Sequence, residues 1–381
     1  MDYRQFFERI PKIELHIHLI GCVRVETLIE IAAKNDHVLP EYKQPEDLYW
    51  KQWFFDVYPM VCHALRDADD FYRIAYESQQ DGAAVGTRYR ELFWSPSIHM
   101  GDGIDYKTAL EGVLQGLADG EKDFGIRTNL IADIPRFTEV DAGIELLEIM
   151  ISNPHEKVIG LGMDFEYSGS PEKHREAYRM AKAAGLKLCG HCGQAEPAAN
   201  IAYCIDELGF NRVDHGYSVV LDNDLLQRCV NEEIVYTVCP VITQRGLFPW
   251  ALSKHPVREM INQGLKVTIG SDDPTMIDSD LTKDMILMAE NMGYRPADFK
   301  EFTLNGIDAC WLDESTRKQW RATWAKEIDA LLAEVDTNES LHYALDEENW
   351  KWSHSGIQTP CEERNRFWQH GEEIKSKMAE N

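Results

Sequence analysis

The sequence predicts an α/β fold, a (β/α)8 TIM barrel with additional C-terminal helices, and two observations lead to this prediction. Strand-like and helix-like segments alternate through most of the 381-residue chain, as they do in proteins built on a parallel sheet. Eight strand-like runs lie within roughly 270 residues, which matches such a barrel in both number of units and length. Because the chain shows no linker composition and no internal repeat, we expect one domain over 1–381, with 315–381 a helical extension packed on the barrel.

The first strand has the clearest pattern of the eight. Within 11–21, apolar residues alternate with Glu14, His16 and His18, the period of two that is typical of a strand. His16 and His18 therefore share one face, about 7 Å apart along the strand. The later strands are predicted from apolar runs near residues 87, 128, 158, 186, 211, 234 and 266.

Helical patterns lie between most of these strands. Apolar residues at helical spacing predict helices at 25–35, 69–85, 106–124, 141–152, 171–184, 198–208, 224–231, 256–263 and 315–335. The segment 40–63 is rich in aromatic residues, which fits either a helical core face or an apolar lid over a pocket.

The composition excludes several classes of protein. A net charge of −26 opposes binding to nucleic-acid backbones and to anionic membranes. No apolar run approaches the ~18 residues of a membrane span, and the N-terminus lacks the pattern of a signal peptide. Nine cysteines, an odd number, suit a reducing compartment better than a disulfide framework. We therefore expect a cytoplasmic protein with a small-molecule partner, no nucleic acid and no membrane; a homo-oligomer stays an open alternative.

Polar side chains gather where several of the strands are predicted to end. His16 and His18 close the first strand, His191 the fifth, His215 the sixth and Asp272 the eighth. The carboxyl ends of the strands carry the active site in such barrels, so we expect these residues to meet. Three imidazoles and one carboxylate are ligands that suit Zn²⁺ and leave one coordination position for a water molecule. The metal would lower the pKa of that water to about 7.

These residues also allow two other interpretations. An isolated His-x-His is equally consistent with two hydrogen-bonded histidines in a core. Cys189 and Cys192 form a C-x-x-C motif of the thioredoxin type. The chain lacks a compact βαβ unit around that motif, and His191 stands where the barrel needs a ligand, so the metal interpretation is favoured.

Four motifs occur in a particular order along the chain. They are Pro-Lys-Ile-Glu-Leu-His-Ile-His-Leu at 11–19, His-Cys-Gly at 191–193, Asp-His-Gly at 214–216 and Ser-Asp-Asp-Pro at 271–274. Together they resemble the adenosine deaminase family of the amidohydrolase superfamily, over nearly the whole barrel. The resemblance implies that one Zn²⁺ per chain is bound by His16, His18, His191 and Asp272. It also implies that His215 orients and deprotonates the attacking water, that Asp273 hydrogen-bonds the substrate ring, and that the backbone of Gly193 lies against it.

Three positions depart from the family pattern. The family's His-Ala-Gly-Glu is His-Cys-Gly-Gln here, and Gln194 cannot protonate a ring nitrogen because its amide has no dissociable proton. Ile20 replaces an aspartate that touches the ribose side of adenosine, and Phe165 falls near a glycine that lets the purine pack closely. The candidate catalytic residues are His215, Asp272 and Gln194, and the candidate substrate contacts are Ile20, Phe165, Gly193, Gln194 and Asp273.

The leading functional hypothesis is a zinc-dependent aminohydrolase, that is, a hydrolytic deaminase. It would attack a small heterocyclic or amine-bearing molecule other than adenosine with a metal-bound hydroxide. Glu166 and Glu196 are candidate proton sources, the alternative being that both are solvated loop carboxylates. Two alternative functions are a catalytically inactive metal- and ligand-binding homologue and a metallohydrolase of non-deaminase type. The presence of His215 weighs against the inactive homologue, because a sensor has no need of a proton-transfer histidine.

Overall fold

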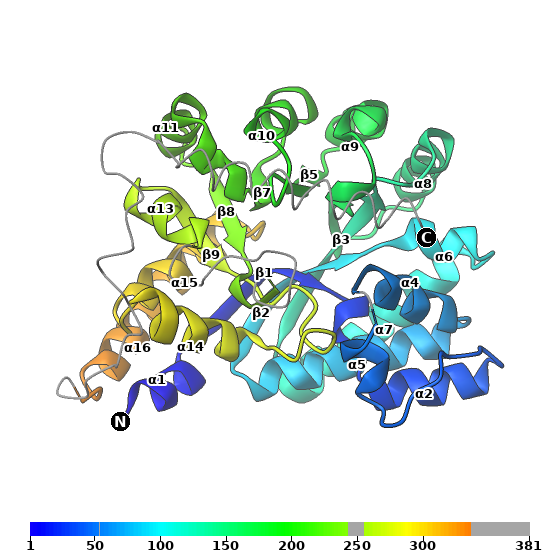
Figure 1. Cartoon of the computed structure of the whole chain (residues 1–381), viewed down its shortest axis with the longest axis horizontal. Helices are drawn as coiled ribbons and strands as arrows, with labels where there is room; N and C mark the ends of the chain where they lie inside the picture. The colour runs from blue at the N-terminus through cyan, green and yellow to red at the C-terminus, as the bar shows by residue number, and fades with distance from the viewer. Residues whose placement is uncertain (53, 243–254, 337–381) are drawn as a thin grey trace.

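The computed structural model describes residues 1–52, 54–242 and 255–336, and its strands form a parallel barrel (Figure 1). The strands are β1 (Lys12–His18), β2 (Thr87–Trp94), β3 (Arg127–Pro135), β4 (Val158–Asp164), β5 (Lys187–Leu188), β6 (His191–Cys192), β7 (Arg212–His215), β8 (Val235–Val238) and β9 (Lys266–Ile269). They pair in two runs, β1-β2-β3-β4-β5 and β6-β7-β8-β9. All eight predicted strands are present, and the predicted barrel fold is confirmed.

The fifth predicted strand is divided into β5 and β6. Between them Gly190 has a φ of +154°, and a Cβ at this position would lie 2.7 Å from the Cβ of Met163. Backbone hydrogen bonds continue across the break, from Cys189 N to Leu161 O at 3.2 Å and from Asp214 N to Gly190 O at 3.1 Å. The two short strands therefore act as one barrel strand, bent where the glycine lets two backbones approach closely.

The barrel closes where β1 meets the chain after β9. Ile17 forms a parallel bridge with Asp272. The His18 N–H donates to Asp272 O at 2.9 Å, and the Asp272 N–H donates to His16 O at 3.2 Å. The same backbone contacts that close the barrel thus bring three of the predicted metal ligands together.

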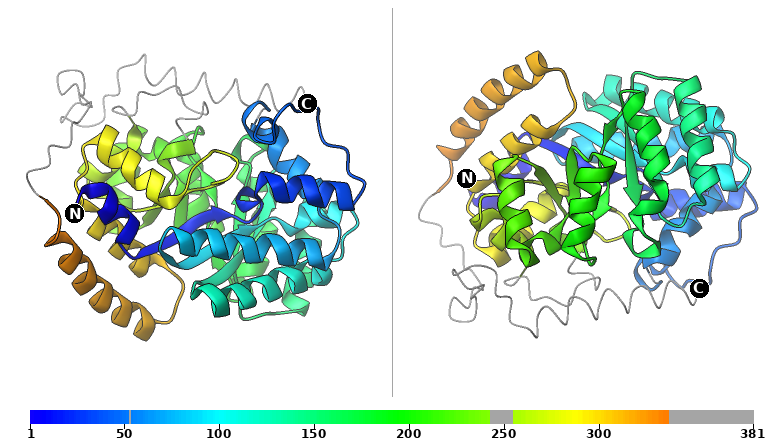
Figure 2. Two further views of the ribbon diagram at one scale, coloured as in Figure 1. Left: turned by 90° about the horizontal axis from the view of Figure 1, so that it is seen from below. Right: turned by 90° about the horizontal axis from the view of Figure 1, so that it is seen from above.

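Helices surround this barrel (Figure 2). They are α1 (Tyr3–Arg9), α2 (Val25–Lys34), α3 (Asp47–Trp50), α4 (Phe54–Ala64), α5 (Ala68–Ala84), α6 (Pro96–Gly101), α7 (Tyr106–Phe124), α8 (Val140–Ser152), α9 (Arg175–Ala183), α10 (Ala198–Tyr203), α11 (Asn223–Asn231), α12 (Pro240–Ile242), α13 (Pro256–Asn262), α14 (Leu281–Met292), α15 (Asp298–Ala309) and α16 (Glu314–Leu332). Short helical turns η1 (Ile20–Cys22), η2 (Glu166–Ser168), η3 (Pro171–His174), η4 (Cys204–Leu208) and η5 (Tyr217–Leu221) complete the connections.

The longest helices show local reasons for their limits. The side chain of Asp105 accepts from Thr108 N at the start of α7, and Gly125 ends that helix in the left-handed conformation. Helix α7 packs closely on α5, because a Cβ at Gly116 would lie 2.3 Å from the carbonyl oxygen of Tyr72. Of this pair of helices, α5 packs against β2 and α7 packs against β3.

A buried ion pair fills the barrel interior away from those carboxyl ends. Arg212 of β7 donates to Glu91 of β2 at 2.6 Å, and both side chains are almost completely buried. The Arg212 guanidinium also lies 4.3 Å from the ring centre of Trp311, and the backbone N–H of Trp311 donates to Glu91 at 2.5 Å. These contacts thus join residues from three distant segments of the chain.

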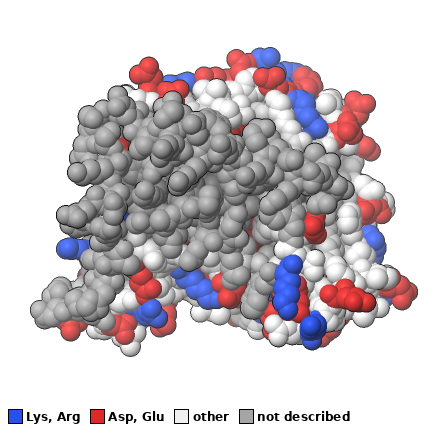
Figure 3. Space-filling model, in the orientation of Figure 1, with Lys and Arg blue, Asp and Glu red and all other residues white. Residues whose placement is uncertain are grey.

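The C-terminal part of the chain is only partly described. Helix α16 lies within the predicted extension, whereas residues 337–381 lie outside the described residues, so the extension as a whole stays a prediction. Within the described ranges, no helix is long and apolar enough to cross a membrane. On the face drawn in Figure 3, acidic and basic side chains are interspersed around the edge of the molecule.

Candidate metal centre and active-site cavity

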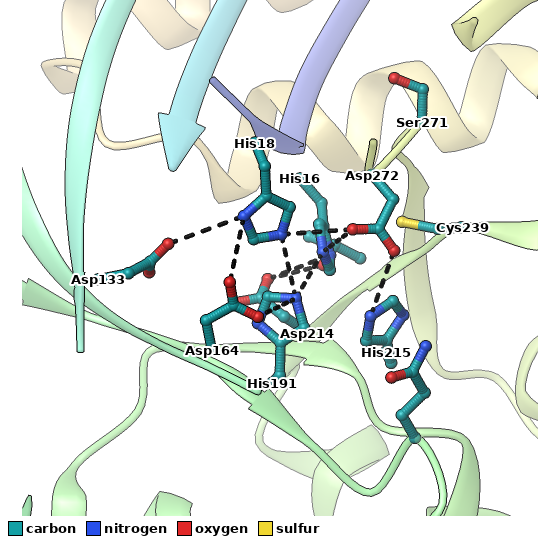
Figure 4. Close-up of polar contacts among 12 residues, drawn as sticks. His16, His18, Asp133, Asp164, His191, Asp214, His215, Cys239, Ser271 and Asp272 are labelled. Carbon is teal, nitrogen blue, oxygen red and sulfur yellow. Dashed lines mark hydrogen bonds and ion pairs between the residues drawn. The ribbon is translucent and has the colours of Figure 1, made fainter. Parts of the chain in front are cut away.

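Four of the sequence-predicted residues meet in one buried cluster. His16 and His18 come from β1, His191 begins β6, and Asp272 follows β9; one ligand atom from each lies within 4.8 Å of all the others (Figure 4). The Nε2 atom of His191 lies 3.1 Å from that of His16 and 3.2 Å from that of His18. The Oδ1 atom of Asp272 lies 3.4 Å and 3.3 Å from the same two Nε2 atoms.

These separations fit a shared metal ion. Four ligands at about 2.0–2.1 Å from a tetrahedral centre lie about 3.3 Å from one another, close to the distances found here. Three imidazole nitrogens and one carboxylate are a donor set that Zn²⁺ accepts. In addition, the second oxygen of Asp272 is buried and makes no hydrogen bond within the described ranges. The residues therefore fit zinc in both chemistry and spacing.

Outer contacts orient two of the three imidazoles. The Nδ1 atom of His16 lies 2.8 Å from the hydroxyl of Thr237, which donates to Asp214 at 2.7 Å. The Nδ1 atom of His191 lies 2.8 Å from the carbonyl oxygen of Met163. These acceptors place the ring proton on Nδ1, so the Nε2 lone pairs face the centre of the cluster, as metal binding requires.

His215 lies beside the cluster at the end of β7. Its Nε2 atom is 3.5 Å from Oδ2 of Asp272. Burial lowers the pKa of His215 well below its usual range, and the neighbouring His16 adds to this effect. The imidazole is therefore neutral and can accept a proton from a group placed between it and the metal ligands.

Three residues around the cluster have a left-handed backbone conformation. Phe165, His215 and Asp272 have φ values of 55°, 63° and 62°, a region that residues other than glycine seldom adopt. Phe165 directly follows β4, His215 ends β7, and Asp272 lies three residues after β9. Such conformations concentrate at functional sites, where the surrounding structure maintains them.

A cavity beside the cluster opens to solvent. Its lining comprises the metal-cluster residues His18, His191 and Asp272, together with Phe54, Phe55, Tyr58, Asp164, Phe165, Glu166, Tyr167, Gln194, His215, Ile242 and Asp273. Helix α4 contributes three of the aromatic side chains, so part of the aromatic segment 40–63 covers the pocket, as the lid interpretation predicts. Three carboxylates line it besides Asp272, and the described residues of the lining include no lysine or arginine.

The side chain of Gln194 is held in one orientation. The Tyr167 hydroxyl donates to Oε1 of Gln194 at 3.0 Å. The Glu166 carboxylate accepts from the backbone N–H groups of Gln194 at 2.9 Å and Ala195 at 2.6 Å. Since its oxygen is already bonded, Gln194 has its NH₂ group left to donate to a ligand in the cavity.

The two candidate proton sources occupy different environments. Glu166 lines the cavity; burial and, to a smaller extent, the nearby Glu196 carboxylate raise its pKa to about 7 against the opposing effect of Arg136. Glu196 is bonded to the Arg136 guanidinium at 2.5 Å and to Asn200 at 2.9 Å. It is not part of the cavity lining, so of the two only Glu166 can meet a bound ligand.

The remaining predicted substrate contacts are divided between cavity and core. Phe165 and Asp273 line the cavity. Ile20 is fully buried and stands outside the lining, because β1 ends at His18 and the chain turns into η1. Gly193 is also outside the lining; its carbonyl accepts from Ser218 N at 2.8 Å, and a Cβ there would lie 2.5 Å from a methyl carbon of Ile201.

The comparison with known proteins explains this geometry. The family model described as adenosine deaminase matches residues 11–326. The chain belongs to the adenosine deaminase family. A crystal structure of an amidohydrolase from Burkholderia ambifaria with bound zinc is 36% identical, with a TM-score of 0.83 over 87% of this chain and 94% of that one. An adenine deaminase from Vibrio parahaemolyticus is 31% identical over 323 residues, covering 83% of this chain and 95% of its own. The crystal structure of an adenine deaminase from Arthrobacter aurescens is 29% identical, with a TM-score of 0.79 over 85% of this chain and 99% of that one.

Family membership and the buried cluster together confirm the class of enzyme predicted from the sequence. The chain is a zinc-dependent hydrolytic deaminase with a substrate pocket that differs from that of adenosine deaminases. The hypothesis of an inactive homologue and that of a non-deaminase hydrolase are set aside.

Sequence reasoning missed several residues that the structure places at the site. Tyr167 and Asp164 line the cavity, and Thr237 supports His16. Asp164 could have been found, because it is a carboxylate at the end of a predicted strand. Tyr167 and Thr237 carry no local signal, since their proximity to the site arises from contacts between segments far apart in the sequence.

Proposed function

We propose that this deaminase acts on adenine or a closely related amino-substituted free base that carries neither sugar nor phosphate. The relatives named adenine deaminase, which this chain matches over more than four fifths of its length, support this assignment. The lining of the cavity is the observation that carries it.

The charge of the cavity favours a ligand rich in N–H donors. Asp164, Glu166 and Asp273 supply acceptor oxygens, and the described lining holds no positively charged side chain that would bind a phosphate. A free base has a ring N–H and an amino group to donate, whereas a nucleoside has lost the ring N–H to its glycosidic bond. A nucleotide adds charges that these carboxylates repel.

The walls of the cavity favour a planar ring. Phe55, Tyr58 and Phe165 form one aromatic wall, with ring centres 6.0 Å apart for Phe55 and Phe165 and 5.4 Å apart for Tyr58 and Phe165. Such a wall stabilises a flat heterocycle by stacking and edge contacts.

The metal ligands, His215 and Asp273 have different roles in the proposed reaction. We propose one zinc ion per chain, held by His16, His18, His191 and Asp272; when bound, zinc supplies a Lewis acid that lowers the pKa of a coordinated water to about 7. His215, neutral and adjacent to Asp272, accepts a proton from the attacking water. Asp273 accepts a hydrogen bond from a substrate N–H.

Gln194 determines which member of this substrate class fits best. Its NH₂ group donates to an acceptor on the ring but cannot transfer a proton. A base with a carbonyl oxygen opposite this amide needs no proton there, whereas adenine itself presents a ring nitrogen. An oxo-substituted aminopurine is therefore the variant of the class that best suits this residue.

A matched substrate series tests the proposal. Ammonia release would be measured with the zinc-loaded enzyme on adenine, 2-oxoadenine, adenosine and AMP. We expect kcat/KM for at least one free base within the usual enzyme range of about 10⁴–10⁸ M⁻¹s⁻¹, and values for adenosine and AMP at least about 10³-fold lower. A preference for the nucleoside or the nucleotide, or no ammonia from either base, would contradict the proposal.

A further inference from the structure

We propose that Asp133 is a positioning residue for the metal centre, the carboxylate that orients the ligand His18 through its Nδ1 atom. The proposal concerns metal binding, so it does not depend on which substrate the enzyme deaminates. Asp133 stands near the end of β3, on the side of His18 opposite the metal cluster, and Figure 4 shows its carboxylate directed at the His18 ring.

The first support is that the contacts of the Asp133 side chain in the described residues indicate no other role for it. Its side chain is completely buried, and neither of its carboxylate oxygens makes a hydrogen bond to any part of the chain that the structure describes. It is also absent from the cavity lining, so a bound substrate does not reach it. A buried carboxylate without partners is costly, which makes a purely structural role for Asp133 a poor explanation.

The second support is that the neighbouring strand makes room for this carboxylate. A Cβ at Gly162 of β4 would lie 2.0 Å from Oδ1 of Asp133 and 3.0 Å from the ring of Phe93. Any side chain at position 162 would therefore displace the carboxylate. Gly162 thus occupies the position of β4 beside the Asp133 carboxylate, where a larger residue would not fit.

The third support comes from the other two histidine ligands. His16 and His191 each have Nδ1 within 2.8 Å of an acceptor, Thr237 and the carbonyl of Met163. The Nδ1 atom of His18 makes no hydrogen bond in the described ranges and has two carboxylates nearby, Asp164 at 3.6 Å and Asp133 at 3.8 Å. An acceptor on Nδ1 fixes the ring orientation and raises the basicity of Nε2 toward the metal.

Asp133 is the better assignment of these two carboxylates. Asp164 lines the cavity, and its Oδ1 atom already accepts from Phe165 N at 2.6 Å. Asp133 is absent from the cavity lining, and its Oδ2 atom lies 3.8 Å from the Nδ1 atom of His18. Both carboxylates lie near the Nδ1 atom of His18. Only Asp133 lies outside the cavity lining, so a bound substrate leaves its position unchanged.

The test compares zinc affinity in three variants, Asp133→Asn, Asp164→Asn and Asp284→Asn. Asp284 is a matched control, since it is an equally buried aspartate whose partners are Val241 N and Ser279 rather than a metal ligand. Zinc dissociation constants would be measured by competition with a chelator, and the melting temperature of each zinc-free protein would be recorded. We expect Asp133→Asn to weaken zinc binding about 10–100-fold. We expect the melting temperature of its zinc-free form not to fall, because neither carboxylate oxygen of Asp133 makes a hydrogen bond in the described residues that the variant would break.

The other variants separate the alternatives. Asp164→Asn should change zinc affinity less than Asp133→Asn and should raise KM, and Asp284→Asn should leave zinc affinity unchanged. As a second route, Gly162→Ala keeps the charge but displaces the carboxylate, and it should also weaken zinc binding. Unchanged zinc affinity in Asp133→Asn would overturn the proposal. So would two zinc ions per wild-type chain with one lost in Asp133→Asn, since His18, Asp133 and Asp164 would then form a cation site of their own.

Discussion

Replacement of His18 by alanine should remove zinc from the protein and lower deaminase activity by at least about 10³-fold. The Nε2 atom of His18 faces both His191 and Asp272 at 3.2–3.3 Å, so its loss leaves three ligands and an open side toward the cavity. Elemental analysis of the purified variant gives the zinc content, and ammonia release gives the activity. Both should fall together, because the attacking water is activated only at the metal.

A matched control separates metal loss from the loss of a buried imidazole. His174 is likewise buried, but it is no part of the metal cluster. His174→Ala should therefore retain zinc and most of its activity per folded molecule, even where its stability decreases. A His18→Ala protein that lacks zinc yet remains fully active would refute the assigned role of the cluster.

The second large effect is expected for Gln194→Glu, which should weaken activity on the native substrate by about 10–100-fold. The side-chain oxygen that accepts from Tyr167 stays in the variant, whereas the NH₂ group is replaced by a second oxygen. A donor to the substrate is thereby lost and its acceptor is left unpaired, which costs about 1–3 kcal/mol. The new carboxylate also adds negative charge to a cavity that already contains Asp164, Glu166 and Asp273.

The same variant should not become an adenosine deaminase. A glutamate at 194 restores a group that can protonate a ring nitrogen, an effect typically worth about 10²–10⁴-fold. However, Phe165 still occupies the cavity wall, and Ile20 still replaces the family's aspartate that touches the ribose. Kinetics of the variant on adenosine decide this point. A large increase in activity on adenosine would mean that Gln194 alone prevents an otherwise ordinary adenosine-binding pocket from deaminating adenosine.

The barrel and the metal cluster could be predicted because their signals are local. The alternation around His16 and His18 defines a strand, and the strand-end positions of His191 and Asp272 follow from the next apolar runs. The general rule that parallel barrels gather function at the carboxyl ends of their strands then brings these residues together. The structure adds the break at Gly190, which the apolar run near residue 186 does not reveal.

The substrate pocket could be predicted only in part, because it depends on how distant segments turn. Period-two alternation places Ile20 on the same face as His18, but the strand ends at His18 and Ile20 is buried in η1. Tyr167 reaches Gln194 only because η2 folds against the segment that follows β6. Asp133 of β3 approaches His18 of β1 across the one strand between them, β2, and no spacing in the sequence predicts that approach.

Titration of zinc-free enzyme with zinc tests the central claim most directly. Ammonia release from the best free base of the substrate series would be followed from zero to two equivalents of zinc per chain. Activity should rise from near zero in proportion to added zinc and stop rising at one equivalent, because one cluster of three histidines and Asp272 supports the reaction. Full activity in the zinc-free protein, or a rise that continues to two equivalents, would contradict the account.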